Sequence, residues 1–75
     1  MLTVTEFYKD FYGCSASIRI YNNNRASLHI SDPYGKTIVG KQYKNRHGAR
    51  VAMGKYSDCW EFLRLKTSGR IKIGG

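Results

Sequence analysis

The chain has 75 residues, of which 41% are hydrophobic and 13% aromatic, with eight Gly, one Pro and two Cys. This length predicts a single domain over residues 1–75, and the aromatic and β-branched content argues against a disordered chain. Thirteen Lys and Arg against five Asp and Glu give a formal net charge of +8. The sequence has no apolar run of about 18 residues, so it predicts no membrane span.

The N-terminus and the cysteines bear on the compartment. Residues 1–6 contain neither the basic segment nor the apolar core of a secretory signal. We therefore expect a cytoplasmic protein in which Cys14 and Cys59 are free thiols. A single Cys14–Cys59 disulfide is the alternative that two cysteines leave open.

The positive charge is concentrated in the second half of the chain. Residues 1–35 contain three basic and three acidic side chains, whereas residues 36–75 contain ten basic and two acidic ones. The segment Lys36–Arg50 has five cations, a histidine and no acid. Such a distribution is typical of a surface that faces a polyanion, and a charge excess that only favours solubility is the alternative.

The first predicted element is a helix over residues 3–12. Apolar side chains recur there at the spacing of one helical face: Val4, Phe7, Tyr8 and Phe11. Thr3 and Glu6 have the spacing of a capping box, and Gly13 lies where a C-terminal cap belongs. We expect Phe7, together with Phe62 and Trp60, to lie in the core.

Three strands are predicted next. Residues 15–21 and 26–31 alternate between apolar and polar side chains, and the Asn22–Asn24 segment between them favours a turn. The Asp32–Gly35 segment, Asp-Pro-Tyr-Gly, is typical of a hairpin turn, and a third strand follows over residues 37–43. Which side chains of this strand face inward is ambiguous, because Ile38 and Val39 are adjacent.

The last third of the chain allows two interpretations. Asn45 is expected to cap a short helix over residues 46–53, which Gly54 would end. Apolar spacing would allow that helix to continue to Leu63. Because Gly54 and Asp58 disfavour a helix interior, we prefer a strand over residues 59–66, a link at 67–69 and a last strand at 70–73. The predicted fold is therefore α+β, with the two helices (3–12 and 46–53) packed on an antiparallel sheet of three to five strands.

Neither metal binding nor catalysis is supported by a motif. The potential ligands lack the close spacing of a structural zinc site: Cys14, His29, His47 and Cys59. The Gly35–Thr37 segment resembles the end of a phosphate-binding loop but lacks its earlier glycine. We therefore expect no enzyme, no metal, no cofactor and no small-molecule substrate.

A nucleic-acid surface is the interpretation we prefer. Arg19, Tyr21 and His29 would share the exposed face of the sheet, and Lys41 and Tyr43 would join them if Ile38 faces inward. Cations contact phosphates and aromatic rings stack on exposed bases. The predicted nucleic-acid-binding residues are Arg19, Tyr21, His29, Lys41, Tyr43, Lys44, Arg46 and Arg50. We expect their cations to line one continuous side, and an ordinary solvated sheet face is the alternative.

Protein binding is the second hypothesis. The chain has six tyrosines, and Tyr and Arg are frequent in interface hot spots. A terminal strand at Arg70–Ile73 would leave a sheet edge on which a partner, or a second copy in a homodimer, could pair. The protein would then be a stoichiometric inhibitor or adaptor that docks on a nucleic-acid-processing complex.

Two resemblances to known families accompany these readings. The order of the predicted elements over about residues 17–53 resembles that of the amino-terminal DNA-binding domains of phage and transposon integrases. This order is two strands, an Asp-Pro-Tyr-Gly-Lys turn, a third strand and a short helix. That resemblance implies a three-stranded sheet in the major groove, with Arg19, Tyr21, His29, Lys41 and Tyr43 facing it. The chain also resembles small accessory proteins of phages and integrative elements. This second resemblance lies in four segments: 4–7, 17–21, 56–58 and 69–73. Some phage proteins of this size inhibit host defence, including anti-CRISPR proteins.

Overall fold

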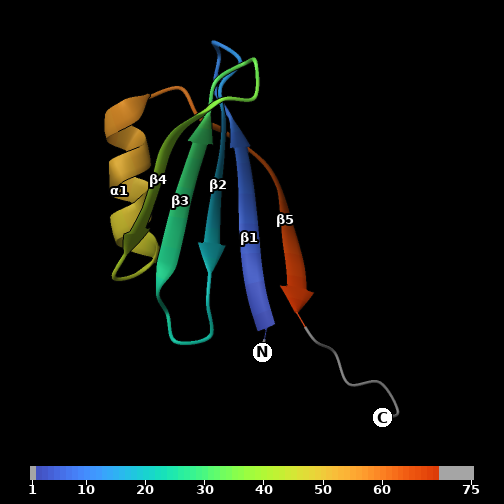
Figure 1. Cartoon of the computed structure of the whole chain (residues 1–75), viewed down its shortest axis with the longest axis vertical. Coiled ribbons are helices and arrows are strands. Elements are labelled where there is room, and N and C mark those ends of the chain that lie inside the picture. The colour runs from blue at the N-terminus through green and yellow to red at the C-terminus, as the bar shows by residue number, and fades with distance from the viewer. Residues whose placement is uncertain (1, 70–75) are drawn as a thin grey trace.

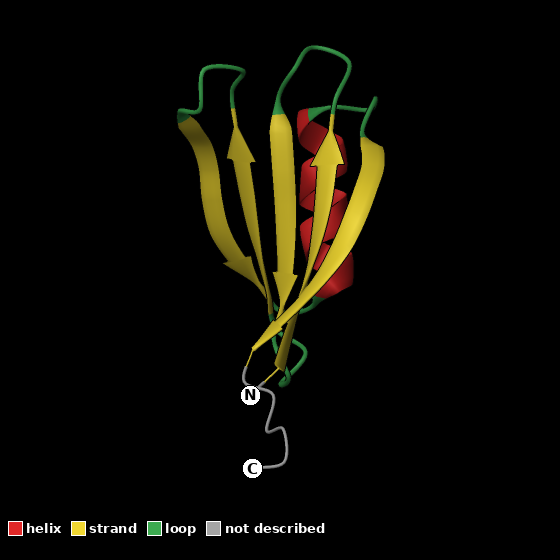
Figure 2. Ribbon diagram, turned by 90° about the vertical axis from the view of Figure 1, so that its right-hand side faces the viewer, coloured by secondary structure: helices red, strands yellow, loops and turns green. Residues whose placement is uncertain are grey.

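The computed structural model describes residues 2–69 as a five-stranded antiparallel sheet with one helix on one of its faces (Figures 1 and 2). The elements are β1 (Leu2–Lys9), β2 (Ser15–Ile20), β3 (Ala26–Ser31), β4 (Thr37–Tyr43), α1 (Arg46–Tyr56) and β5 (Glu61–Gly69). The strand order is β4-β3-β2-β1-β5, so β5 returns past the helix to pair with the first strand. The predicted combination of an antiparallel sheet with helix is confirmed, but one of the two predicted helices is wrong.

The predicted N-terminal helix is instead the strand β1, which pairs with β2 on one side and β5 on the other. The consecutive residues Thr3, Val4 and Thr5 are β-branched, which disfavours a helix and suits a strand. Gly13, predicted as a helix cap, lies in the β1–β2 turn with φ +94°. The helical spacing of the apolar residues was compatible with a strand as well, and pairing on both sides decides in its favour.

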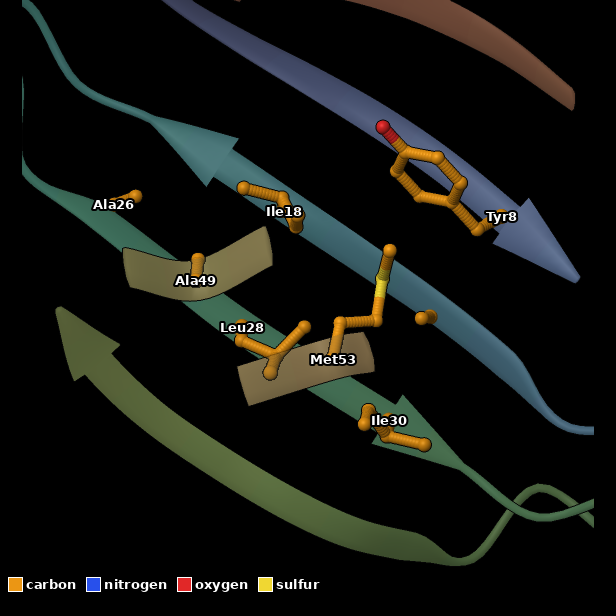
Figure 3. Close-up of a cluster of buried hydrophobic side chains, with 8 residues drawn as sticks. Tyr8, Ile18, Ala26, Leu28, Ile30, Ala49 and Met53 are labelled. Carbon is orange, nitrogen blue, oxygen red and sulfur yellow. The ribbon is translucent and has the colours of Figure 1, made fainter. Parts of the chain in front are cut away.

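The core lies between α1 and the face of the sheet that we call the helix side. Ile18, Leu28 and Ile30 are the largest fully buried side chains, and Ala49 and Met53 of the helix pack onto them (Figure 3). The helix packs on β2, β3 and β4. The opposite face, which we call the open face, is not covered by any element of residues 2–69 (Figure 2).

The helix α1 begins as predicted and ends later than predicted. Asn45 Oδ1 accepts a hydrogen bond from the backbone N–H of Gly48 at 2.9 Å, which confirms the N-cap. The helix passes Gly54 and ends at Tyr56, where Trp60 Nε1 donates to the carbonyl of Met53 at 2.8 Å. Within residues 2–69, no helix combines the length and the hydropathy that crossing a membrane requires.

The segment after the helix is a strand, so the alternative of a helix continuing to Leu63 is wrong. β5 includes residues 67–69, which we predicted as a link, and they pair with the start of β1. The predicted last strand at 70–73 lies outside the described residues. Trp60 packs against the core as expected, whereas Phe62 is 52% exposed and Phe7 lies on the open face, so both of those core predictions are wrong.

Two aspartates build equivalent turns at the same end of the sheet. Asp32 Oδ1 accepts from the backbone N–H groups of Tyr34 and Lys36 at 2.9 and 2.8 Å, and Gly35 has φ +89°, which confirms the predicted hairpin. Asp10 Oδ1 accepts in the same way from residues 12 and 14, at 2.9 and 2.7 Å. Hydrogen bonds from nearby backbone N–H groups to an aspartate side chain stabilise a turn without contacts from distant parts of the chain.

Candidate nucleic-acid interface

The strand register arranges the open face in two rows of side chains that run across all five strands. The first row, which we call the cationic row, contains Lys66, Thr5, Arg19, Ser27 and Gln42. The second row, which we call the aromatic row, contains Arg64, Phe7, Ser17, His29 and Gly40. Neighbouring strands lie about 4.8 Å apart, so the side chains within each row are direct neighbours.

In the cationic row, one basic side chain lies on each side of the short side chain of Thr5. Thr5 pairs with Lys66 on β5 and with Arg19 on β2, and both cations are exposed. Tyr21 lies two residues beyond Arg19, and its hydroxyl is 3.3 Å from Ser27 Oγ. Of the two carboxylates in the described strands, Glu6 lies on the helix side and Glu61 lies opposite Lys9, away from this row. The row is therefore positive and has no acid within it.

The aromatic row contains a cation over a ring and a neighbouring imidazole. The guanidinium carbon of Arg64 lies 4.8 Å from the centroid of the Phe7 ring. Ser17 separates Phe7 from His29, whose side chain is exposed. Gly40 lies beside the imidazole, and a Cβ at that position would lie 3.7 Å from His29 Nε2. A methyl group at this position would therefore make an ordinary van der Waals contact with the ring, so the ring lies close to the β4 backbone.

Two hollows open on this face and share Ser17 and His29. The smaller, of about 360 Å³, lies between Phe7 and His29 and also contacts Leu63 and Arg64. The larger, of about 620 Å³, is lined by Arg19, Tyr21, His29, Gln42 and their neighbours. The open face thus offers hollows with polar, apolar and aromatic lining beside a line of positive charge.

Three of the predicted site residues lie together on the open face as expected: Arg19, Tyr21 and His29. The expectation that Tyr43 joins them is wrong, and Lys41 meets them only at the border of the larger hollow. Val39, not Ile38, pairs with the buried Ile30, so Lys41 lies opposite Leu28 and Tyr43 opposite Ala26, all on the helix side. Tyr43 packs against the core, and Lys41 borders the larger hollow from the edge strand β4.

The remaining predicted residues lie beside or on the helix. Lys44 follows β4, Arg46 forms an ion pair with Glu6, and Arg50 lies 5.6 Å over the ring of Tyr8. Glu6 and Tyr8 both belong to the helix side. The expectation of one continuous cationic surface is therefore wrong, because the register and the helix distribute the cations over two sides of the sheet.

Phe7, Arg64 and Lys66 were missed as site residues. Phe7 was assigned to a helix and to the core, and the prediction for residues 59–66 did not specify which side chains face which way. The consecutive β-branched residues Thr3, Val4 and Thr5 were the signal that could have placed Phe7 on a strand. The positions of Arg64 and Lys66 on the open face depend on the bulge between Phe7 and Tyr8, which shifts the register of β5 against β1. The sequence does not reveal this bulge.

The two cysteines are free, as predicted. Burial and the neighbouring Asp10 carboxylate raise the pKa of Cys14 above its ordinary value, which favours the neutral thiol. Cys59 Sγ accepts a hydrogen bond from the backbone N–H of Phe11 at 3.4 Å. Among residues 2–69, no three His, Cys, Asp or Glu side chains form a group that could hold a metal ion.

The chain matches no protein-family model, no curated protein and no solved structure. The resemblances to integrase DNA-binding domains and to small phage accessory proteins therefore stay predictions.

Proposed function

We propose that this chain is a non-enzymatic module that binds nucleic acid through the open face of its sheet. The observation that carries the proposal is the register that places Arg19 and Lys66 on either side of Thr5, in a row without a carboxylate among the described residues. Arg64 adds a third cation in the neighbouring row. Phe7 and His29 add rings on the same face. We propose a module of the kind that phages and mobile elements encode.

In this proposal the cations and the rings have different tasks. Arg19, Lys66 and Arg64 contact phosphates, which supplies most of the affinity and makes it depend on salt. Tyr21 and His29 contact bases or sugars. With three phosphate contacts, the logarithm of the binding constant for a single strand falls with the logarithm of the salt concentration with a slope of about −2.

The test is a binding titration with fluorescent oligonucleotides in which two double variants lose the same charge. Arg19→Gln with Lys66→Gln removes cations from the open face, and Lys44→Gln with Lys55→Gln removes them from the loop before α1 and from its last turn. We expect the first pair to weaken binding roughly tenfold and the second to change it less than about twofold. Equal losses in both pairs would contradict an interface on the open face.

Protein binding is the second candidate function, and the strand β5 favours it. β5 is nine residues long and forms one edge of the described sheet. Phe62, Leu63 and Leu65 on this strand are each 52% exposed. A long apolar edge strand is a surface on which an extended segment of a partner adds a further strand. An inhibitor or adaptor of a nucleic-acid-processing complex would dock in this way.

A pull-down from nuclease-treated host lysate separates the two candidates. The protein-binding function predicts that one specific protein is retained, that Leu65→Lys abolishes its retention, and that Arg19→Gln with Lys66→Gln leaves it unchanged. The nucleic-acid function predicts that retained proteins disappear with nuclease treatment.

A further inference from the structure

We propose, on the basis of the nucleic-acid function above, that the smaller hollow on the open face is a slot for an unpaired nucleobase and that the partner is therefore single-stranded. The slot lies between Phe7 and His29, and Ser15, Ser17 and Ser31 also line it. The width of the sheet, the distance between β1 and β3 and the neighbouring cations support this proposal.

The width of the open face argues against a duplex groove. Five strands at about 4.8 Å spacing make the rows about 19 Å long. The major groove of B-DNA is about 12 Å wide and admits an α-helix or a two-stranded ribbon. A duplex would therefore contact the rim of the face and leave the hollows empty. A single strand laid across the sheet can reach both rows along their whole length.

The distance between the strands that carry Phe7 and His29 suits one planar base. Phe7 on β1 and His29 on β3 both lie opposite Ser17 on β2, so their backbones are about 10 Å apart. A base placed midway between these two strands would lie about 5 Å from each backbone, so the side chains of Phe7 and His29 can both contact it. Ser17, the residue between them, is small enough to leave this space open. The volume of about 360 Å³ accommodates a base with part of its sugar.

The lining of the slot is partly polar and partly apolar, which suits a nucleobase with its sugar. Serine hydroxyls both donate and accept hydrogen bonds, so the three serines can match the edges of different bases. Arg64 lies over the ring of Phe7 and brings a positive charge to the lining of the slot. Leu63, half-exposed at the same hollow, provides an apolar contact for the sugar.

The cationic row lies beside the slot at the distance that a nucleotide requires. Arg19 is two residues from Ser17 on the same strand, so the two rows are about 7 Å apart. The sugar that links a phosphate to its base spans a comparable distance. Phosphates held by Arg19 and Lys66 would thus place one base between Phe7 and His29. Binding would tolerate different sequences, because every base has a π face.

The experiment compares four fluorescent probes of one sequence: single-stranded RNA, single-stranded DNA, duplex RNA and duplex DNA. Each is titrated at about 50 and 200 mM salt. We expect the single strands to bind at least about tenfold more tightly than the duplexes. Phe7→Leu and His29→Ala should each weaken single-strand binding roughly tenfold and leave duplex binding unchanged. The preferred single strand identifies the partner as RNA or DNA.

Phe11→Leu is the matched control, because Phe11 is 85% exposed and lies in the β1–β2 turn outside the slot. Far-ultraviolet circular dichroism of each variant establishes that it folds. A single-stranded probe with 2-aminopurine, whose fluorescence is quenched by stacking, should be quenched by the wild type and less by His29→Ala.

The outcomes separate the slot from the function on which it rests. Duplex binding as tight as single-strand binding, with no effect of Phe7→Leu and His29→Ala, overturns the slot and preserves nucleic-acid binding. The absence of binding to all four probes at low salt overturns both. Slot variants that bind single strands normally but lose a nuclease-resistant protein partner also overturn the slot, because its occupant would then be a protein side chain.

Discussion

Arg46 Nε donates a hydrogen bond to Glu6 Oε2 at 2.8 Å and so joins the first turn of α1 to β1. The other carboxylate oxygen, Oε1, accepts from the hydroxyl of Tyr8 at 2.9 Å. Glu6 is only 6% exposed, so both oxygens of a buried carboxylate are satisfied by protein groups. This cluster explains why a glutamate is tolerated on the helix side, and it engages a cation that we had expected to bind nucleic acid.

Removing the guanidinium should destabilise the fold. Arg46→Met leaves the Glu6 carboxylate buried without its cation, and we expect the free energy of unfolding to fall by about 2 kcal/mol. The loss is below that of a fully buried pair because the Arg46 side chain is 44% exposed. Urea unfolding measures the change. The control Lys44→Met, in the exposed loop before the helix, should change the stability by less than about 0.5 kcal/mol.

The Tyr8 phenol should make stability depend on alkaline pH. Burial first, then the hydrogen bond to Glu6 and its negative charge, raise the pKa of Tyr8 above its ordinary value of 10.0. A raised pKa in the folded state means that the contribution to stability is fully present below pH 10 and is lost as the pH rises through the raised value. The stability difference between wild type and Tyr8→Phe should therefore shrink above pH 10. A difference that stays constant to higher pH would contradict this cause.

Two glycines with similar backbone conformations allow strain to be separated from crowding. Gly13 and Gly35 have φ +94° and +89°, a region that other residues rarely adopt. A Cβ at Gly35 meets no atom within 4 Å, whereas a Cβ at Gly13 would lie 3.2 Å from Pro33 Cγ. We expect Gly35→Ala to cost about 1 kcal/mol and Gly13→Ala about 2 kcal/mol. Thermal unfolding of both variants is the measurement, and equal losses would show that the Pro33 contact relaxes without cost.

Locally determined elements could be predicted from the sequence. The Asp32–Gly35 turn and the Asn45 cap depend on hydrogen bonds between residues at most four positions apart, and both were predicted correctly. The β1 strand could not be predicted in this way. Its apolar residues fit both a helical and a strand interpretation, and its conformation is decided by pairing with β5, which lies more than fifty residues away in the sequence.

The candidate site depended on the same distant pairing. Arg19, Tyr21 and His29 were placed correctly because β2 and β3 alternate clearly between apolar and polar side chains. Lys41 and Tyr43 were misplaced because Ile38 and Val39 are both apolar, and the sequence alone does not show which one pairs with Ile30. The choice of Val39 brings Tyr43 against the helix at Gly48, a contact between elements rather than within one.

Nuclear magnetic resonance of the aromatic and imidazole side chains, during titration with a single-stranded oligonucleotide, shows whether the open face is the binding surface. Phe7, Tyr21 and His29 lie on the open face, whereas Tyr43 lies on the helix side and Tyr56 lies at the end of α1. We expect the ring signals of the first three residues to shift in a saturable way and those of Tyr43 and Tyr56 to stay in place. Shifts confined to Tyr43 and Tyr56, or no shift at saturating oligonucleotide, would rule out binding on the open face.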